Sequence, residues 1–155
     1  MRILIPLDGT PECEEPMPLA QQLASAMAAE VYLLRVVEVK GGLSPFRSDP
    51  DMVRMMDDAA SYLSDLTSRF ELPADRTRRV VREALNAATE IVTFAEIEGI
   101  DLIIMASHRR SWLGRLTQGS VCNEVVRSRI CPVLCVPLAG AQASGQRPGV
   151  SASRS

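Results

Sequence analysis

Short apolar runs and longer amphipathic stretches alternate along the chain, and this alternation predicts its secondary structure. Five runs rich in aliphatic and β-branched residues have the length of β-strands; they are residues 2–7, 31–37, 78–83, 102–105 and 133–136. Four stretches place apolar residues at helical spacing; they are residues 11–28, 51–70, 87–98 and 121–130. Strands that alternate with helices predict an α/β fold built on a parallel sheet.

Prolines, a glycine and methionines refine three of the expected helices. Pro16 and Pro18 place the start of the first regular helix near themselves, because proline fits a first turn and not an interior. Gly99 is expected in the C′ position, where it ends the third helix. The second helix carries an apolar stripe whose methionines we expect to fill the core; they are Met52, Met55 and Met56.

The character of the runs predicts their order in the sheet. Residues 2–7 are almost wholly apolar, which is typical of a central strand covered on both faces. Residues 78–83 (RRVVRE) are polar, which is typical of an edge strand. With right-handed crossovers, these features predict an open five-stranded parallel sheet in the order 3-2-1-4-5, with helices on both faces, a Rossmann-like arrangement. Ligands of such sheets bind at the switch point, here between strands one and four, where residues 6–10 and 105–120 meet.

A small-residue pair marks the place where a loop meets the fourth helix. Gly119 and Ser120 leave free backbone N–H groups beside the positive end of the helix dipole, which suits a phosphate. The same residue types also favour an ordinary helix start without any ligand. Both interpretations stay open on the residues alone.

Three stretches stand out together: ILIPLDGT, an apolar run that ends in Pro-x-Asp; VYLLRVV, a second apolar run; and EGIDLIIMASHRR…LGRLTQGSV…CPVLCVP, with a methionine before a loop and Gly-Ser after it. In these stretches the chain resembles the universal stress protein family over residues 1–138. ILIPLDGT is similar to the opening strand, which ends in Pro-x-Asp, and VYLLRVV to the second strand. EGIDLIIMASHRR…LGRLTQGSV…CPVLCVP is similar to the final third, normally read as Met-Gly-x-x-Gly, nine residues, then Gly-Ser or Gly-Thr. The resemblance implies a fold like that of the adenine nucleotide alpha hydrolases and a homodimer through the last strand, residues 132–137. Residues 139–155 have almost nothing to bury and are expected to form a disordered tail.

The resemblance also implies nucleotide-binding positions. Gly119 and Ser120 match the last two motif positions, where backbone N–H groups and a hydroxyl meet phosphates. Pro6 and Asp8 match positions that line the nucleotide, with Asp8 near the ribose and phosphates. Val36 matches a second-strand position whose backbone reads adenine. The implied ligand is an adenine nucleotide, ATP or AMP, with Mg²⁺ as a companion of ATP.

The glycine loop departs from the family pattern at two of its positions. Met105 matches the methionine before the loop, but Ala106 stands at the first motif glycine and Arg109 at the second. Alanine adds one methyl group, which is tolerable if the torsion there is ordinary. A left-handed torsion at Arg109 would cost about 1–2 kcal/mol, or about tenfold in affinity. The guanidinium can instead pair with phosphate oxygens, so both outcomes stay open.

Composition constrains the partners of the protein. With 155 residues, 46% hydrophobic and 23% charged, the chain is expected to form a globular domain. The formal net charge of -2 gives no basic field, so nucleic acid is not an expected partner. No apolar run has the length of a membrane span and the start lacks a signal peptide, so we expect a soluble, cytoplasmic protein without a membrane partner. The four cysteines are expected to be buried thiols, with Cys131 and Cys135 facing one side of the last strand.

Two functional hypotheses follow, and a third has less support. The first is a stress-response regulatory protein that binds adenine nucleotide at the switch point. The second is a dimeric interaction module of the same family without nucleotide, favoured by the loss of both early motif glycines. The third is slow ATP hydrolysis. The chain has no Walker motif, nucleophile elbow or carboxylate–histidine–nucleophile set, so we do not expect an enzyme. The protein partner is not indicated by the sequence.

Overall fold

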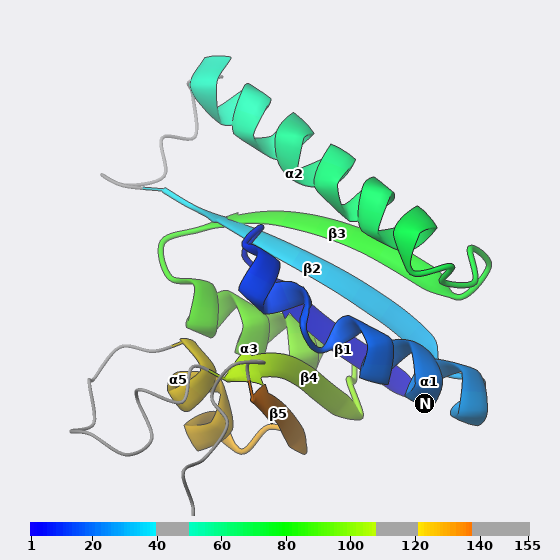
Figure 1. The fold of residues 1–155 in the computed structure, drawn as a ribbon. Helices are drawn as coiled ribbons and strands as arrows, with labels where there is room; N and C mark the ends of the chain where they lie inside the picture. Colours follow the sequence, from blue (N-terminus) through cyan, green and yellow to red (C-terminus); the bar gives the residue numbers. More distant parts are fainter. Residues whose placement is uncertain (40–49, 108–120, 138–155) are drawn as a thin grey trace, which may run out of the picture.

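The computed structural model describes residues 1–39, 50–107 and 121–137, which form one parallel sheet with helices on both faces (Figure 1). The strands are β1 (Arg2–Leu7), β2 (Glu30–Glu38), β3 (Thr77–Ala84), β4 (Leu102–Ser107) and β5 (Val133–Pro137). The helices are the 3-10 helix η1 (Pro11–Glu14), α1 (Met17–Met27), α2 (Pro50–Arg69), α3 (Ala87–Ile97) and α5 (Val121–Ser128). The strand order is β3-β2-β1-β4-β5, which confirms the predicted fold class.

β1 lies at the centre of the sheet and is buried on both faces. Every residue from Ile3 to Leu7 is buried. β1 pairs with β2 over its full length, as far as Leu7 beside Arg35, and with β4 on its other side. One cluster of buried apolar side chains lies between the sheet and α1 and α2, and a second lies between the sheet and α3 and α5. A strand covered on both faces requires a continuous apolar run, which is what the sequence provides.

Local sequence signals set the helix ends, and those expected at Pro18 and Gly99 are confirmed. α1 begins at Met17 with Pro18 in its first turn. Asn86 caps α3, because its side-chain oxygen accepts a hydrogen bond from the N–H of Thr89 at 2.8 Å. Gly99 follows α3 with φ of +59°, the left-handed torsion that favours glycine after a helix.

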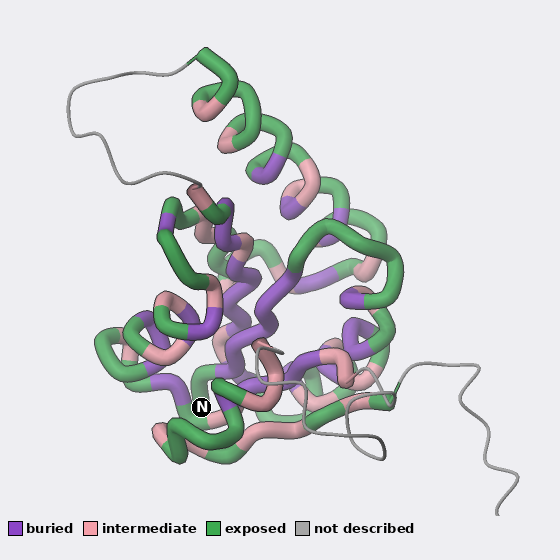
Figure 2. Tube along the Cα trace, turned by 90° about the vertical axis from the view of Figure 1, so that its left-hand side faces the viewer, coloured by how far each residue is buried: buried purple, intermediate pink, exposed green. Residues whose placement is uncertain are grey.

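The N-terminal half of α2 is largely exposed, so the expectation that its methionines fill the core is wrong. Met55 is 48% exposed, and Met52 and Met56 are partly exposed. The C-terminal half packs on the core through Leu63 and Leu66, which are fully buried. Figures 1 and 2 show the first turns of α2 extending past the sheet at the end where β2 finishes. The methionine stripe therefore lies on a part of the helix with little of the sheet beneath it.

β5 forms one edge of the sheet, and two expectations about its cysteines are wrong. Cys131 precedes the strand, because the chain enters the sheet only after Pro132, so Cys131 and Cys135 do not share a strand face. Cys135 is exposed and not buried. The apolar side chains of Leu134 and Val136 are only partly covered, as befits an edge strand.

The predicted tail at 139–155 lies outside the described residues. The domain boundary expected at residue 138 also falls there and stays a prediction. Within the described ranges, no helix has both the length and the apolar character needed to cross a bilayer.

Candidate functional site

A pocket of about 660 Å³ opens at the carboxyl ends of the strands, at the switch point between β1 and β4. Its walls come from the ends of β1, β2, β4 and β5 and from the N-terminal parts of α3 and α5. A volume in this range is typical of small-molecule sites. The structure therefore places a cavity where the topology predicts a ligand.

The chain leaves β1 through a tight turn that fixes the carboxylate of Asp8 beside the pocket. Asp8 Oδ1 accepts hydrogen bonds from the N–H of Thr10 at 2.8 Å and from its hydroxyl at 2.6 Å. Gly9 has φ of +84°, a torsion that side chains disfavour. Burial acts to raise the pKa of Asp8, but the Thr10 hydrogen bonds, with smaller effects of Cys13 and Arg35, lower it overall. Asp8 is therefore an anion at neutral pH.

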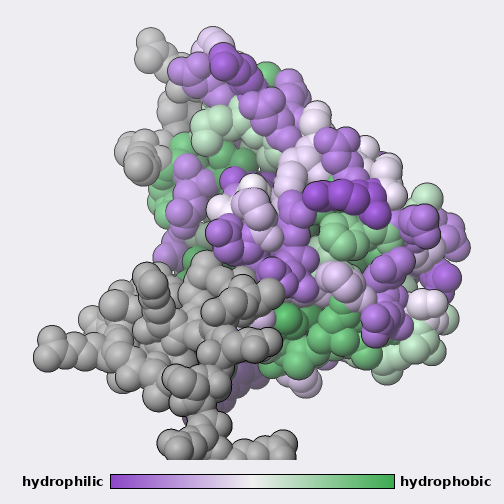
Figure 3. Space-filling model, viewed as in Figure 1, coloured by the Kyte–Doolittle hydropathy of each residue, from purple (hydrophilic) through white to green (hydrophobic). Residues whose placement is uncertain are grey.

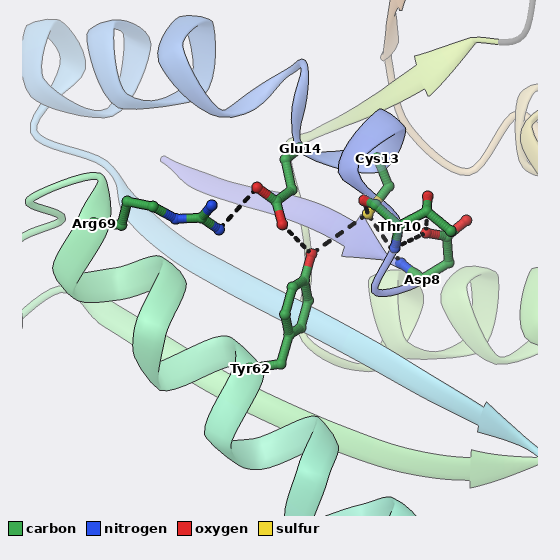
Figure 4. Close-up of polar contacts among 6 residues, drawn as sticks. All are labelled: Asp8, Thr10, Cys13, Glu14, Tyr62 and Arg69. Carbon is green, nitrogen blue, oxygen red and sulfur yellow. Dashed lines mark hydrogen bonds and ion pairs between the residues drawn. The ribbon is translucent and has the colours of Figure 1, made fainter.

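Polar contacts tie this turn to α2 (Figure 4). The thiol of Cys13 accepts from the N–H of Asp8 at 3.3 Å and donates to the carbonyl of Thr10 at 3.0 Å. The same sulfur lies 3.6 Å from the hydroxyl of Tyr62 on α2. That hydroxyl donates to Glu14 of η1 at 3.1 Å. The position of the turn is thus coupled to the packing of α2.

An ion pair completes the connection between η1 and α2. Arg69 Nη2 lies 2.8 Å from Glu14 Oε2, and the Glu14 side chain is only 17% exposed. Burial raises the pKa of Tyr62, and the neighbouring Cys13 thiol adds to the effect. Burial also raises the pKa of Cys13. The Tyr62 hydroxyl and the Cys13 thiol are therefore protonated at neutral pH. These two neutral groups and the partly covered ion pair between Arg69 and Glu14 hold the turn after β1 in place.

The backbone of β2 leaves the carbonyl of Val36 facing the side of β1. The N–H of Val39 bonds to β3, whereas that of Glu30 bonds on the β1 side. Backbone groups of a parallel strand alternate between its two neighbours, so those of Val36 point toward β1. β1 pairs only as far as Leu7 beside Arg35. The Val36 carbonyl consequently lies past the end of β1, where the pocket opens.

Arg35 occupies the space that opens where β1 turns away. Its Nη1 donates to the carbonyl of Val36 at 2.9 Å. A Cβ placed on Gly9 would lie 3.6 Å from Nε and Nη2 of the same guanidinium. Arg35 also lines the pocket, although it is not among the site residues predicted from the sequence. The sequence does contain a sign of its role, because Arg35 is the one charged residue in the otherwise apolar strand VYLLRVV.

The end of β4 forms another wall of the pocket, through Met105 and Ala106. Ala106 pairs with Val136 of β5 as a regular strand residue. It is not among the described residues with positive φ. The condition under which alanine could replace the motif glycine is therefore met at this position.

Two cysteines meet in the wall formed by α5 and β5. Cys122 lies in the first turn of α5, Cys135 lies in β5, and their sulfur atoms are 3.5 Å apart. Burial and the neighbouring Cys135 raise the pKa of Cys122 to about 12. Both residues line the pocket. This pair was not predictable from the sequence, because a separation of 13 residues fits no cysteine motif.

Five of the predicted nucleotide-binding residues lie in the described part of the chain, and all of them line the pocket; they are Pro6, Asp8, Val36, Met105 and Ala106. Arg109, Gly119 and Ser120 lie outside the described residues, so their placement stays a prediction.

Comparisons with known proteins agree on one family. The sequence profile of the universal stress protein family matches residues 1–137. The universal stress protein MJ0531 of Methanocaldococcus jannaschii is 31% identical over 142 residues, which cover 87% of this chain and 81% of that protein.

Solved structures show the same fold. The protein MJ0577, from the same organism, superposes with a TM-score of 0.70 at 24% identity, covering 90% of this chain and 97% of its own. A universal stress protein in complex with cAMP has a TM-score of 0.62 at 19% identity, with coverage of 90% and 98%. One from Archaeoglobus fulgidus in complex with dAMP has a TM-score of 0.61 at 17% identity, with coverage of 87% and 96%.

Proposed function

Because the chain belongs to the universal stress protein family, we propose that its pocket binds an adenine nucleotide and that occupancy changes the surface it presents to a partner in a cytoplasmic stress response. The observation that carries the proposal is the pocket of about 660 Å³ at the switch point, lined by every predicted site residue that the structure describes. The neighbours solved with cAMP and dAMP support an adenine nucleotide as the ligand.

The base fits the apolar part of the pocket. Leu34 and Val36 of β2 and Ile91 of α3 supply aliphatic walls that can cover the faces of a purine. A carbonyl oxygen has two lone pairs, and Arg35 uses one of those on Val36. The other lone pair can accept from the amino group of adenine, whereas guanine presents an acceptor at that position. The arrangement therefore favours adenine over guanine.

The sugar and phosphates fit the polar side of the pocket. The ionised Asp8 can accept hydrogen bonds from ribose hydroxyls. The first residues of α5 line the pocket, so the positive end of that helix faces the space for the phosphates. Gly119, Ser120 and Arg109 precede α5 in the chain, and we propose them as further phosphate contacts.

A magnesium ion would have to arrive with ATP. Asp8 is the only carboxylate among the described residues that line the pocket. In the described ranges no group of three or more metal-binding side chains comes together. Mg²⁺ commonly takes one or two carboxylates together with phosphate oxygens and water. Asp8 fits that role, with the remaining ligands supplied by the nucleotide and solvent.

Thermal unfolding of the purified protein tests the proposal. A nucleotide at 100 times its dissociation constant stabilises by about 2.7 kcal/mol, which raises Tm by about 5–11 °C for a domain of this size. We expect shifts with AMP, ATP and cAMP, a smaller shift with GTP, and none with inorganic phosphate. No shift with any adenine nucleotide at millimolar concentration, together with no nucleotide extracted from the purified protein, would overturn it.

We place the function in binding and not in turnover. The pocket offers Asp8 as an isolated carboxylate, without a paired base and nucleophile among the described residues that line it. Phosphate release from ATP should therefore equal the background rate and should be the same in Asp8→Ala. Release that is above background and disappears in this variant would show hydrolysis.

A second candidate function, a dimeric interaction module, is favoured by the exposed edge of β5. Figure 3 shows hydrophobic surface below α1, at the end of the sheet where β4 and β5 lie. Pairing of β5 with a second copy, through residues 132–137, would cover this edge. Pro132 O bonds to the N–H of Ile103 on β4, so by alternation the N–H of Val133 points outward. Val133→Pro removes that donor and leaves the pairing with β4 intact.

Sedimentation at micromolar concentration should give the mass of two chains for the wild type and of one chain for Val133→Pro. A monomeric wild type would contradict the dimer. A dimer that shows no thermal response to adenine nucleotides would support the interaction module in place of the nucleotide-binding function.

A further inference from the structure

The cysteine pair in the pocket wall supports an inference that does not depend on nucleotide binding. The sulfur atoms of Cys122 and Cys135 are 3.5 Å apart, and both residues are free thiols. A disulfide bond requires about 2.05 Å between sulfur atoms, so the two side chains together must move by about 1.5 Å. α5 and β5 lie close in sequence and pack together, so the two thiols stay neighbours in the folded chain.

We propose that Cys122 and Cys135 are a reversible redox-modification site, at which a small disulfide such as glutathione disulfide joins α5 to β5 through an intramolecular disulfide bond. The thiolate of Cys135 first attacks one sulfur of the small disulfide, forms a mixed disulfide and releases a thiolate that takes up a proton. Cys122 then gives up its proton and attacks the Cys135 sulfur as the thiolate, which breaks the mixed disulfide; the second small thiolate leaves and takes up that proton. Two protein thiols are oxidised, and one small disulfide is reduced to two thiols.

The surroundings assign the two steps to different cysteines. Cys135 is exposed and meets the oxidant, whereas Cys122 is half-buried. Burial and the hydrogen bond with Cys135 raise the pKa of Cys122, so at neutral pH it holds its proton and can donate to the Cys135 sulfur. The second step is intramolecular, between two sulfur atoms that are already neighbours. It is therefore favoured over the reverse of the first step, in which a small thiol attacks the mixed disulfide and frees Cys135.

Neither of the other cysteines fits this role. Cys13 is buried, and its sulfur is engaged by Thr10 and Tyr62. Cys131 lies before β5, and no hydrogen bond among the described residues joins its sulfur to another thiol. The Cys135 side chain faces Cys122 of α5, with 3.5 Å between the two sulfur atoms. The cross-link would join two walls of the same pocket.

Peptide mapping after incubation with glutathione disulfide tests the proposal. Trypsin cleaves after Arg127 and Arg129 and separates Cys122 from a peptide that carries both Cys131 and Cys135, so the Cys131→Ser variant gives an unambiguous map. In this variant and in the wild type we expect a linked peptide as the main product, reversed by dithiothreitol. Cys122→Ser should stop the reaction at a glutathione adduct on Cys135.

The outcomes that overturn the proposal are equally distinct. They are a stable glutathione adduct on Cys135 in the wild type, a link to Cys131, or a link between two chains on a non-reducing gel. Circular dichroism shows whether the serine variants fold. If Cys122→Ser does not fold, the maps of the wild type and Cys131→Ser decide the question without it.

Discussion

Replacing Asp8 separates what its carboxylate does for folding from what it does for a ligand. Asp8→Ala removes the oxygen that accepts from the N–H of Thr10 at 2.8 Å and from its hydroxyl at 2.6 Å. Asp8→Asn keeps an oxygen in the same place and removes only the charge. The two variants together therefore distinguish hydrogen-bonding geometry from electrostatics.

The two hydrogen bonds set the size of the effect on stability. A hydrogen bond to a charged group contributes about 1.5–3 kcal/mol, and exposure of Asp8 to solvent reduces the pair to about 1–2 kcal/mol. We expect Asp8→Ala to lose this amount of unfolding free energy, a decrease in Tm of about 2–8 °C. Asp8→Asn should lose less than half of it. Equal losses in urea titrations of the two variants would contradict this account of the turn.

The stability difference between wild type and Asp8→Ala should depend on pH. The pKa of Asp8 is lowered in the folded protein, whereas an aspartate in an unfolded chain has a pKa of about 3.9. The folded state therefore binds this proton less readily than the unfolded state. The stabilisation is complete above the unfolded value and is lost as pH falls through the folded one. A difference that is unchanged between neutral pH and about pH 3 would refute the electrostatic part.

The contribution of Asp8 to ligand binding is measured with AMP and the Asp8→Asn variant, which is expected to fold like the wild type. Loss of a charged acceptor for the ribose hydroxyls should cost about 1.5–3 kcal/mol of binding free energy, which is about 10–150-fold in affinity. Isothermal titration calorimetry without metal measures it directly. If Asp8→Asn binds AMP as tightly as the wild type, the ribose does not lie at Asp8 and the proposed orientation of the nucleotide is wrong.

Three further variants and probes address the pocket and its support. Ala106→Leu places a larger side chain against the pocket and should abolish the AMP-induced shift in Tm; an unchanged shift would place the nucleotide elsewhere. Bound AMP should slow alkylation of Cys122 and Cys135, which line the pocket, but not of Cys131, which does not; equal protection of all three in mass spectrometry would indicate general stabilisation. Tyr62→Phe removes a hydroxyl that donates to η1 at 3.1 Å and should lower the unfolding free energy by about 0.5–1.5 kcal/mol in urea titrations; no loss would show that this bond does not contribute.

The fold was predictable because its determinants are local or follow from general rules. A continuous apolar run requires a strand covered on both faces, which places β1 in the middle. The polar residues of β3 are compatible with a position at the edge of the sheet. Right-handed crossovers then leave few possible orders for the remaining strands. Pro18 and Gly99 set helix ends through their own torsions. Each of these signals can be read without knowing which distant residue lies beside it.

The errors arose where a pattern depends on what lies opposite. Helical spacing of Met52, Met55 and Met56 correctly gives one face of α2, but it does not say how far the sheet extends beneath that face. The same limitation hid the contact between Cys122 and Cys135, since only the packing of α5 on β5 brings the two sulfurs together. The periodicity of a helix predicts which residues share a face, whereas the burial of that face also depends on which element packs against it.

The backbone at Ala106 does not require a glycine. A glycine is required where φ is positive or where the backbone must approach a ligand without a Cβ. Ala106 is a strand residue paired with Val136 and has no positive φ, so the first requirement is absent there. The methyl group lines a pocket of about 660 Å³, a volume that accommodates it. Of the two motif glycines that this chain lacks, the one replaced by Ala106 therefore carries no penalty for a left-handed torsion.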